Sequence, residues 1–300
     1  MKAAITGAFS YTGKYIARRL LARGEEVITL TGHPNRPDPF SGKVSALPLS
    51  FDDENGLIHS LTGAEILVNT YWVRFDRGAN TQPRAVENTR RLIQAASRAG
   101  VKRIVHISIT NPSEDSRLPY FWGKAANEKA VIESGISYAI LRPTVLVGTE
   151  DILINNIAFL LRRLPLFALP GDGQYRLQPV YVEDLADLVV DAIYRRDDFL
   201  VDAVGPDIFT FKEMVELIGE KIGARRPMIP VPPRLALMAS QLLSLFLGDV
   251  LLTSEEIDGL MANLLVSNGP PRGTTHLADW LDANKESVGI RYSSEIKRHY

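Results

Sequence analysis

Short apolar runs alternate with amphipathic stretches along the first two-thirds of the chain. The apolar runs have the length of buried strands, and they are Lys2–Thr6, Val27–Thr31, Val44–Leu49, Ile66–Thr70, Ile104–Ser108 and Tyr138–Leu141. The stretches between them have helical spacing, and they are Lys14–Ala22, Glu54–Leu61, Thr81–Ala99 and Tyr120–Glu133. This alternation predicts an α/β fold in which helices cover both faces of a doubly wound parallel sheet.

The pattern changes after Gly148. Residues 151–174 are typical of a helix and a loop, Pro179–Val182 of a strand, Asp184–Tyr194 of a helix, and the chain from Gly205 onward of several helices. We predict a Rossmann-like domain at residues 1–150, completed by about residues 175–204, and a smaller, mostly helical lobe made of residues 151–174 and 205–300. Ligands of such sheets bind beyond the carboxyl ends of the strands, so we expect this lobe to shape a substrate pocket.

The most apolar window is Leu235–Leu247 in the helical tail. It is shorter than the roughly 20 residues that a bilayer requires, and it contains Ser240, Gln241 and Ser244. We predict a buried helix here and no membrane association. A membrane-surface helix and a partner-binding helix are the alternatives, and the tail is the candidate contact for a homodimer or a protein partner.

Composition excludes several classes of function. The 34 basic and 35 acidic residues give a net charge of −1, which argues against a nucleic-acid partner. The chain contains no cysteine, which excludes disulfides, thiolate metal sites and thiol catalysis. Its five histidines lack metal-ligand spacing, so we expect no metal site. The sequence enters a strand directly after Met1, leaving no room for a signal peptide, and we expect a cytoplasmic location.

A glycine-rich turn joins the first strand to the first helix. Its sequence runs from Gly7 through Phe9, Ser10, Tyr11 and Thr12 to Gly13, a G-x-x-G-x-x-G pattern in which serine replaces the middle glycine. Glycine lets the backbone approach a pyrophosphate, and the helix that follows presents free N–H groups and a positive dipole end. A P-loop is excluded, because Lys14 is followed by Tyr15 where a magnesium-binding Ser or Thr is needed.

The end of the second strand bears on the choice of cofactor. An acidic residue there normally accepts the ribose hydroxyls of NAD. Thr31 occupies that place, and His33 and Arg36 follow it. Without the carboxylate a 2′-phosphate is not repelled, and Arg36 can pair with it. The alternative for Arg36 is a solvated loop residue. We therefore expect NADP(H) in preference to NAD(H).

Tyr120 and Lys124 form the chain's only Tyr-x-x-x-Lys pair, at the start of the helix after the fifth strand. Spacing of i,i+4 places both side chains on one helical face. A free tyrosine has a pKa near 10, and a neighbouring ammonium lowers that pKa toward the working range of an acid–base catalyst. The pair therefore indicates a catalytic tyrosine, with a core tyrosine beside a solvated lysine as the alternative.

With these features the chain resembles the short-chain dehydrogenase/reductases, in particular their extended and atypical, epimerase-like branch. Similar segments are Val101–Ser108, Arg142–Gly148 (R-P-x-x-V-x-G), Val180–Ala186 (V-x-V-x-D-x-A) and Val204–Pro206. The resemblance covers about residues 1–225 and is closest to the NAD(P)-binding proteins related to NmrA and to the 39 kDa subunit of respiratory complex I.

The resemblance implies roles for individual residues. Tyr120 is the acid–base, and Lys124 lowers its pKa and contacts the ribose. Around the cofactor it places the glycine-rich turn, Ser50 and Phe51 at the adenine, Asn69, Thr70 and Tyr71 near the ribose and phosphates, and Pro143, Thr144 and Val145 at the nicotinamide.

The chain also departs from this family's pattern. The family usually has a second hydroxyl residue after the strand-five serine, and here Ile109 follows Ser108, so either Ser108 or Thr110 polarises the substrate oxygen or no residue does. We expect an NAD(P)-dependent oxidoreductase or epimerase-type enzyme acting on a small carbonyl or hydroxyl compound, for which a nucleotide sugar is a family analogy. The alternative is a non-catalytic redox sensor or accessory subunit that binds NADP(H), which Ile109 and the apolar helix at 235–247 favour.

Overall fold

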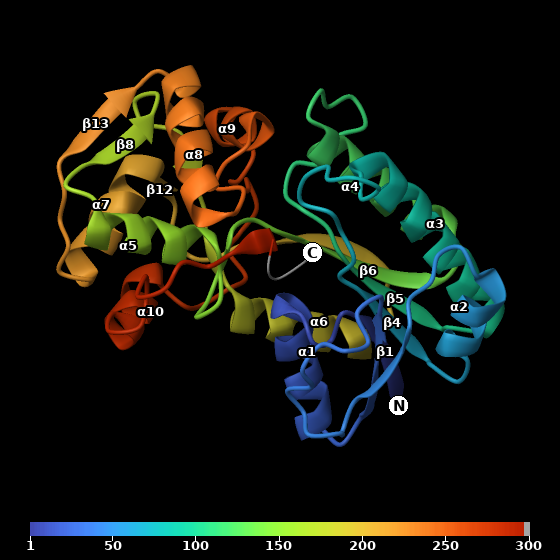
Figure 1. Cartoon of the computed structure of the whole chain (residues 1–300). Coiled ribbons are helices and arrows are strands. Elements are labelled where there is room, and N and C mark those ends of the chain that lie inside the picture. The colour runs from blue at the N-terminus through green and yellow to red at the C-terminus, as the bar shows by residue number, and fades with distance from the viewer. Residues whose placement is uncertain (297–300) are drawn as a thin grey trace. The chain divides into compact units, whose positions relative to one another are not determined.

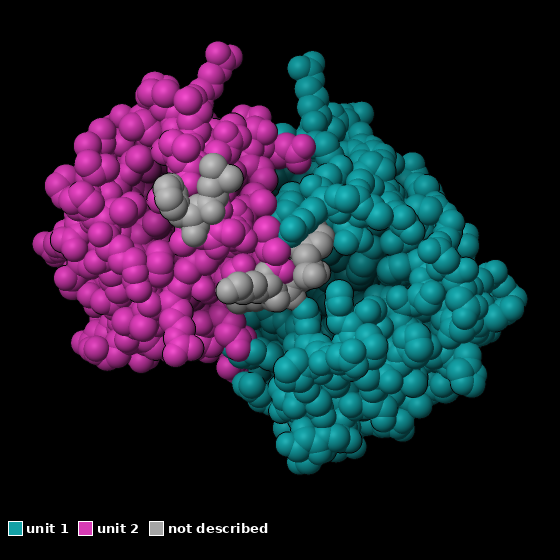
Figure 2. All heavy atoms as spheres, viewed as in Figure 1, with its two compact units in different colours: residues 1–143, 185–203 teal, residues 144–184, 204–300 magenta. Residues whose placement is uncertain are grey.

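The computed structural model describes residues 1–296, except for the side chains of Leu245 and Phe246. The chain divides into two compact units, drawn in different colours in Figure 2. Unit 1 consists of residues 1–143 and 185–203, and unit 2 of residues 144–184 and 204–300. Residues 175–184 lie in unit 2, whereas the sequence placed them with the Rossmann-like domain.

Unit 1 is built on a seven-stranded sheet in the order β11-β6-β5-β4-β1-β2-β3. Its strands are β1 (Lys2–Thr6), β2 (Glu26–Thr31), β3 (Ser45–Pro48), β4 (Ile66–Asn69), β5 (Arg103–Ile107), β6 (Ser137–Pro143) and β11 (Phe199–Ala203). Every neighbouring pair is parallel. The order reverses between β1 and β4, which is the topological switch point where this class of sheet binds its ligands. The predicted α/β fold with a doubly wound parallel sheet is confirmed.

Helices cover both faces of this sheet (Figure 1). They are α1 (Tyr11–Ala22), α2 (Glu54–Leu61), α3 (Gln82–Ala99), α4 (Pro119–Glu133) and α6 (Val182–Tyr194), of which α6 begins in unit 2 and ends in unit 1. The α2, α3 and α4 helices pack side by side on one face. The α1 helix lies beside the unit 1 part of α6, to which an Arg19–Asp187 ion pair joins it. Fully buried β-strand residues such as Ile104 and Ile140 form the core beneath α2–α4.

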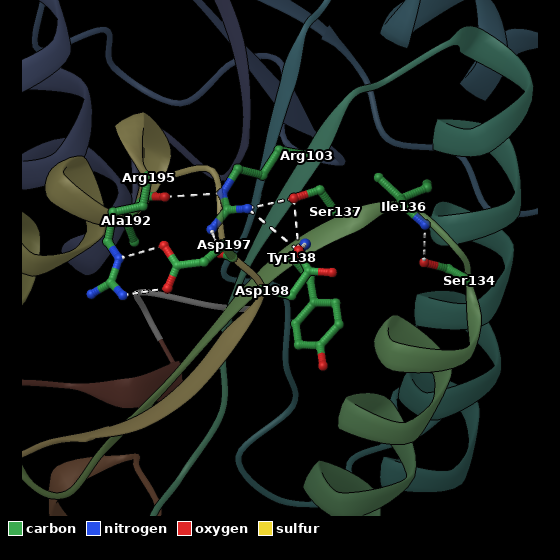
Figure 3. Close-up of polar contacts among 9 residues, drawn as sticks. All are labelled: Arg103, Ser134, Ile136, Ser137, Tyr138, Ala192, Arg195, Asp197 and Asp198. Atoms are coloured by element: carbon green, nitrogen blue, oxygen red, sulfur yellow. Dashed lines mark hydrogen bonds and ion pairs between the residues drawn. The ribbon is translucent and has the colours of Figure 1, made fainter.

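Arg103 ties β5, β6 and the chain before β11 together at the amino-terminal end of these strands (Figure 3). Its guanidinium is buried and donates to the carbonyl oxygens of Ala192 and Asp197 at 3.0 and 2.9 Å and to Ser137 Oγ. Asp198 accepts from both Ser137 Oγ and the backbone N–H of Tyr138 at 2.8 Å. The guanidinium thereby provides hydrogen-bond donors to two backbone carbonyl groups, one near the end of α6 and one between α6 and β11.

In its described residues, 144–184 and 204–296, unit 2 combines helices with three two-stranded sheets. Its elements are β7 (Leu146–Val147), α5 (Leu153–Arg163), β8 (Phe167–Pro170), β9 (Arg176–Leu177), β10 (Val180–Tyr181), β12 (Phe209–Thr210), α7 (Phe211–Lys221), β13 (Met228–Val231), α8 (Pro233–Leu247), α9 (Ser254–Met261) and α10 (Leu277–Asn284). Ile154 of α5, Met214 of α7 and Leu281 of α10 are fully buried in one shared core. Arg162 fastens the later chain to α5 by donating to the carbonyl oxygens of Val288 and Lys285.

The α8 helix corrects the prediction for residues 235–247. A helix forms there, but Leu235, Met238 and Leu242 are 53%, 58% and 60% exposed. Because these positions are three and four residues apart, they form one apolar face of the helix that unit 2 leaves uncovered. The buried-helix prediction is therefore wrong for this face. Among residues 1–296, no helix has both the length and the apolar composition needed to span a bilayer.

Candidate cofactor and active site

The glycine-rich turn brings α1 as close to β1 as the backbone allows. Gly7 has a φ of +75°, the left-handed region that glycine enters without strain, and its N–H donates to Leu30 O at 2.9 Å. A Cβ on Gly13 would lie 2.2 Å from Gly7 O and 3.0 Å from the Ala8 Cα. Both glycines are therefore required by the geometry, one by its backbone angle and the other by contact.

The first turn of α1 is not capped by a side chain. Ser10 is the N-cap residue, but its hydroxyl donates back to Gly7 O at 2.5 Å. The Ser10 hydroxyl is thus used within the turn. Helix N-termini carry N–H groups that lack intrahelical partners and attract anions. Phe9, Tyr11 and Thr12 are half-buried around this helix start.

The segment after β2 is held by backbone and side-chain contacts of its own. Thr31 Oγ1 accepts the N–H of His33 at 2.9 Å, and the N–H of Arg36 donates to His33 O at 3.1 Å. The next carboxylate along the chain, Asp38, accepts the N–H groups of Phe40 and Gly42. Thr31 and Arg36 therefore stand at the end of β2 without an acidic neighbour in the 31–36 segment.

A polar network joins the carboxyl ends of β1, β4 and β5. Asn69 is fully buried; its Oδ1 accepts from Thr6 Oγ1 at 3.3 Å and from the N–H of Tyr71 at 3.1 Å. Its Nδ2 lies 3.1 Å from His106 Nδ1 and must be the donor, so the His106 proton resides on Nε2. Burial and the nearby charge of Lys124 lower the pKa of His106 to about 3, which keeps the imidazole neutral. Thr70 joins the network by donating its hydroxyl to Thr6 O.

The residues expected at the adenine and ribose lie beside this network. The rings of Phe51 and Tyr71 are 4.8 Å apart and tilted by 48°. Asn88 Nδ2 donates to the Tyr71 hydroxyl at 2.9 Å, while Ser50 is exposed. The structure thus brings Asn69, Thr70, Tyr71 and Phe51 together, but the Asn69 side chain serves the network and is inaccessible.

Lys124 is buried at the carboxyl end of β5. Its Nζ donates to Ile107 O at 3.0 Å, and 4% of the residue is exposed. Burial lowers the pKa of Lys124 to about 7, against a smaller opposite effect of Glu128 one turn further along α4. Arg142 of β6 neutralises Glu128 through two hydrogen bonds. This lysine is therefore not the solvated residue of the alternative reading.

Tyr120 lies on the same side of α4 as Lys124. Its ring centroid is 5.9 Å from Lys124 Nζ, and the ring meets Trp72 edge to face at 5.6 Å. Trp72 is one residue that sequence reasoning missed, and Gly123 is another, because its missing Cβ leaves space for the Trp72 ring. A glycine within a helix destabilises the helix by about 1 kcal/mol relative to alanine. The glycine at position 123 was therefore the available sign in the sequence that another group packs closely against this helix.

The hydroxyl residues after β5 are all buried. Ser108 is 3% exposed and its Oγ has no hydrogen-bond partner among the described residues, while Ile109 is 7% exposed and Thr110 fully buried. Pro143 ends β6 and is buried in unit 1. Thr144 and Val145 belong to unit 2, where Thr144 donates to Gln178 O and Val145 O accepts from Val180.

These residues fit a dinucleotide. The Gly7 turn lies directly against an α1 start without a side-chain cap, and the orphaned Ser108 Oγ follows β5 in the same unit. Over the described part of the chain, no three His, Cys, Asp or Glu side chains gather as metal ligands.

Comparison with known proteins agrees with this geometry. Residues 7–194 match a family model described as NAD(P)H-binding. The chain is 27% identical over 239 residues to the mitochondrial NADH dehydrogenase (ubiquinone) 1 alpha subcomplex subunit 9 of Arabidopsis thaliana, covering 73% of this chain and 58% of that protein. It therefore spans less than two thirds of that relative's length.

Solved structures share the fold. An NADPH-dependent quinone oxidoreductase of Escherichia coli, solved with NADPH, is similar with a TM-score of 0.76 and 20% identity, covering 94% of this chain and 99% of that one. A UDP-glucose 4-epimerase of Thermotoga maritima, solved with UDP-glucose, has a TM-score of 0.68 and 18% identity, with 96% and 98% covered.

Proposed function

We propose, from the premise that this chain belongs to the family of NAD(P)H-binding proteins, that it is an NADP(H)-dependent oxidoreductase or epimerase-type enzyme. Its substrate is a small compound with a carbonyl or hydroxyl group. The observation that carries the proposal is the Tyr120–Lys124 pair, in which a buried ammonium is fixed to Ile107 O beside a half-buried tyrosine. Burying a charged ammonium is unfavourable in free energy, so a lysine whose only role was solubility would be expected on the surface.

Each residue of the pair has a defined task in this proposal. Tyr120 exchanges a proton with the substrate oxygen, and protonated Lys124 stabilises the phenolate that this exchange leaves. Ser108 donates its unpartnered hydroxyl to the same oxygen. A nicotinamide held in this site would provide the hydride chemistry at the substrate carbon.

The Gly7–Gly13 turn and the start of α1 would hold the pyrophosphate, while Phe51 would border the adenine, and Tyr71, whose ring packs against that of Phe51, would border the ribose and phosphates. The preference for NADP(H) is supported by Thr31 and Arg36 at the end of β2, where no carboxylate repels a 2′-phosphate.

The cofactor preference is tested by titrating NADPH and NADH against the whole chain by fluorescence. We expect Arg36→Met to weaken NADPH binding by about 10- to 100-fold and to leave NADH binding unchanged, because a charge-assisted hydrogen bond to phosphate is worth roughly 1.5–3 kcal/mol. Tighter binding of NADH than NADPH by the unaltered chain would refute the phosphate argument.

The catalytic proposal is tested with Tyr120→Phe and Lys124→Met. We expect Tyr120→Phe to retain cofactor affinity and to lose turnover by about 100-fold or more, since general acid–base catalysis contributes roughly 10²–10⁴-fold. The assay panel contains carbonyl compounds, quinones and nucleotide sugars, the last two following the names of the structural neighbours. Turnover retained in Tyr120→Phe would contradict the role of this tyrosine.

A non-catalytic accessory subunit or redox sensor is the second candidate. Two observations favour it: the relative named above is a subunit of NADH dehydrogenase, and α8 exposes Leu235, Met238 and Leu242. No turnover on the full panel, together with a partner that co-purifies only in the presence of NADP(H), would establish this candidate in place of the enzyme. For either candidate we propose a cytoplasmic location.

A further inference from the structure

Trp72 contacts both members of the Tyr120–Lys124 pair. It follows β4 by three residues, and its ring meets the Tyr120 ring at a centroid distance of 5.6 Å and an interplanar angle of 83°. Lys124 Nζ lies over the face of the same indole, 5.0 Å from the ring centroid. An ammonium in this position is attracted by the negative face of the ring, most strongly for tryptophan.

Gly123 gives the indole its place. A Cβ on this residue would lie 2.4 Å from Trp72 Cη2 and 3.1 Å from Trp72 Cζ2, distances at which the ring would have to move. Gly123 lies between Tyr120 and Lys124 on α4. One turn of this helix therefore carries the Tyr120–Lys124 pair and the space that the Trp72 ring occupies. The Trp72 Nε1 is buried without a hydrogen-bond partner among the described residues, so packing against α4 holds the ring.

Few other groups act on Lys124. On its own helix Glu128 lies one turn away and Arg142 of β6 pairs with it. From β5, Ile107 O accepts the single hydrogen bond that Lys124 donates within the described residues, and neutral His106 lies near enough to feel its charge. Of the ammonium's three protons, one is thus directed to a carbonyl oxygen. Glu128 and the Tyr120 ring, 5.9 Å away, also favour the charge, and the indole is the nearer of the two aromatic rings, at 5.0 Å.

We propose that Trp72 is a positioning residue, which orients the Tyr120 ring and seats the Lys124 ammonium on its indole face through the gap left by Gly123. This inference rests on the proposed function of the Tyr120–Lys124 pair and adds to it a residue outside the Tyr-x-x-x-Lys motif. An aromatic face stabilises the ammonium without accepting its proton, so it favours the charged form of Lys124 in a buried position.

The test follows the titration of Lys124 in the full chain carrying ¹³C-labelled lysine, by NMR. The Lys124 resonance is the one that disappears in Lys124→Met. We expect Trp72→Leu, which keeps an apolar side chain and removes the π face, to lower the Lys124 pKa by about 0.4–0.7 units. Trp72→Phe, which keeps an aromatic face, should lower it by less.

Two further variants separate positioning from general disturbance. Trp122→Leu is the matched control, because residue 122 is two positions from both Tyr120 and Lys124 and does not share their helical face; it should leave the Lys124 titration unchanged. Gly123→Ala should shift the titration when Trp72 is present and leave it unshifted in the Trp72→Leu background.

An unchanged or raised Lys124 pKa in Trp72→Leu overturns the proposal. Should that variant not fold, an unchanged titration in both Trp72→Phe and Gly123→Ala overturns it instead. The measurement needs neither substrate nor cofactor, so it is distinguishable from failure of the proposed function. If no substrate is turned over, the proposed function fails, but a shift of the Lys124 pKa can still be measured. If the Lys124 pKa does not shift, the role of Trp72 fails, but NADPH binding and turnover can still be observed.

Discussion

Gly13 marks the closest approach between helix α1 and the turn before it. An alanine there would bring its Cβ to 2.2 Å from Gly7 O, which only a backbone movement can relieve. We expect Gly13→Ala to lower the free energy of unfolding by about 1–3 kcal/mol, the usual cost of overpacking, and to abolish NADPH binding. Urea denaturation and cofactor titration measure the two effects.

Gly32→Ala is the matched control. Gly32 follows β2 in the same unit, its φ lies outside the left-handed region, and a Cβ there would meet nothing within 4 Å. Equal losses in both variants would show that the Gly7–Gly13 contact has no special importance.

The buried charge of Lys124 makes stability depend on pH. Its pKa falls from 10.5 in the unfolded chain to about 7 in the folded one. Below pH 7 both states hold the proton and the cost of burying the charge is present in full. Between pH 7 and 10.5 the unfolded state holds more protons than the folded state, so the free energy of unfolding rises with pH. The cost of burying the Lys124 charge is lost over this range, because the folded state has released the proton.

We therefore expect the stability of Lys124→Met relative to the unaltered chain to be greatest below pH 7. That difference should shrink by at most about 1.4 kcal/mol per pH unit above pH 7. Urea denaturation between pH 6 and pH 9.5 measures it. Lys129→Met removes an exposed lysine of the same helix, and its effect should not vary over this range. A difference for Lys124→Met that is constant with pH would contradict the buried ammonium.

Individual site residues could be predicted from the sequence where they belong to a motif with fixed spacing between its residues. Gly7, Gly13, Tyr120 and Lys124 follow from a strand-to-helix turn and an i,i+4 pair, both of which are local. Trp72 was not predictable, because its importance arises from contact with α4, which lies some fifty residues further along the chain. The role that Ser10 takes within the turn was likewise hidden, since a sequence does not show which acceptor a hydroxyl will choose.

Among the elements, β5 carries the site at one end and the Arg103 contacts at the other (Figure 3). We expect Arg103→Met to lower the free energy of unfolding by about 2–4 kcal/mol, because it removes the donor to two carbonyl oxygens and the cation of the ion pair with Asp198. NADPH affinity of the folded protein should be unchanged. Thermal and urea unfolding with a cofactor titration separate the effects.

Lys102→Met is the control at the adjacent position, where an exposed lysine pairs with Glu65. Such surface pairs contribute little, so no measurable loss of stability is expected. A loss of cofactor affinity in Arg103→Met would mean that the two ends of β5 are coupled.

Elements with strong local signals were predicted to the residue. Helix α2 spans Glu54–Leu61 as expected, because Asp53 caps its first turn by accepting the N–H of Gly56. Strand β11 was not predicted, since its short run Phe199–Ala203 becomes a strand only by pairing with β6. The exposure of α8 was not predicted either. An apolar composition shows that burial of a helix face would be favourable, but it does not show whether the rest of the chain covers that face.

At the scale of the whole molecule, membership of the NAD(P)H-binding family confirms the predicted resemblance to the extended and atypical short-chain dehydrogenase/reductases. Unit 1 carries the glycine-rich turn and the Tyr120–Lys124 pair of the proposed site, and unit 2 carries the exposed face of α8. Both candidate functions include a dinucleotide site, so the exposed face of α8 is the feature that separates them.

Replacing Leu235, Met238 and Leu242 together by glutamine tests this face. Since each side chain is already more than half exposed, little burial is lost, and the expected change in unfolding free energy is within about 0.5 kcal/mol per substitution. By contrast Leu281→Gln, at a fully buried position of unit 2, should lose about 2–5 kcal/mol. NADPH affinity should be unaltered by the triple substitution.

Turnover and partner binding then decide between the candidates. An enzyme whose chemistry lies in unit 1 keeps its turnover in the triple variant, because Tyr120 and Lys124 are untouched. An accessory subunit loses a co-purifying partner, because an apolar helix face contributes to association by its buried area. A triple variant that unfolds like Leu281→Gln would contradict the exposure of α8 itself, and thermal unfolding with size-exclusion chromatography distinguishes these outcomes.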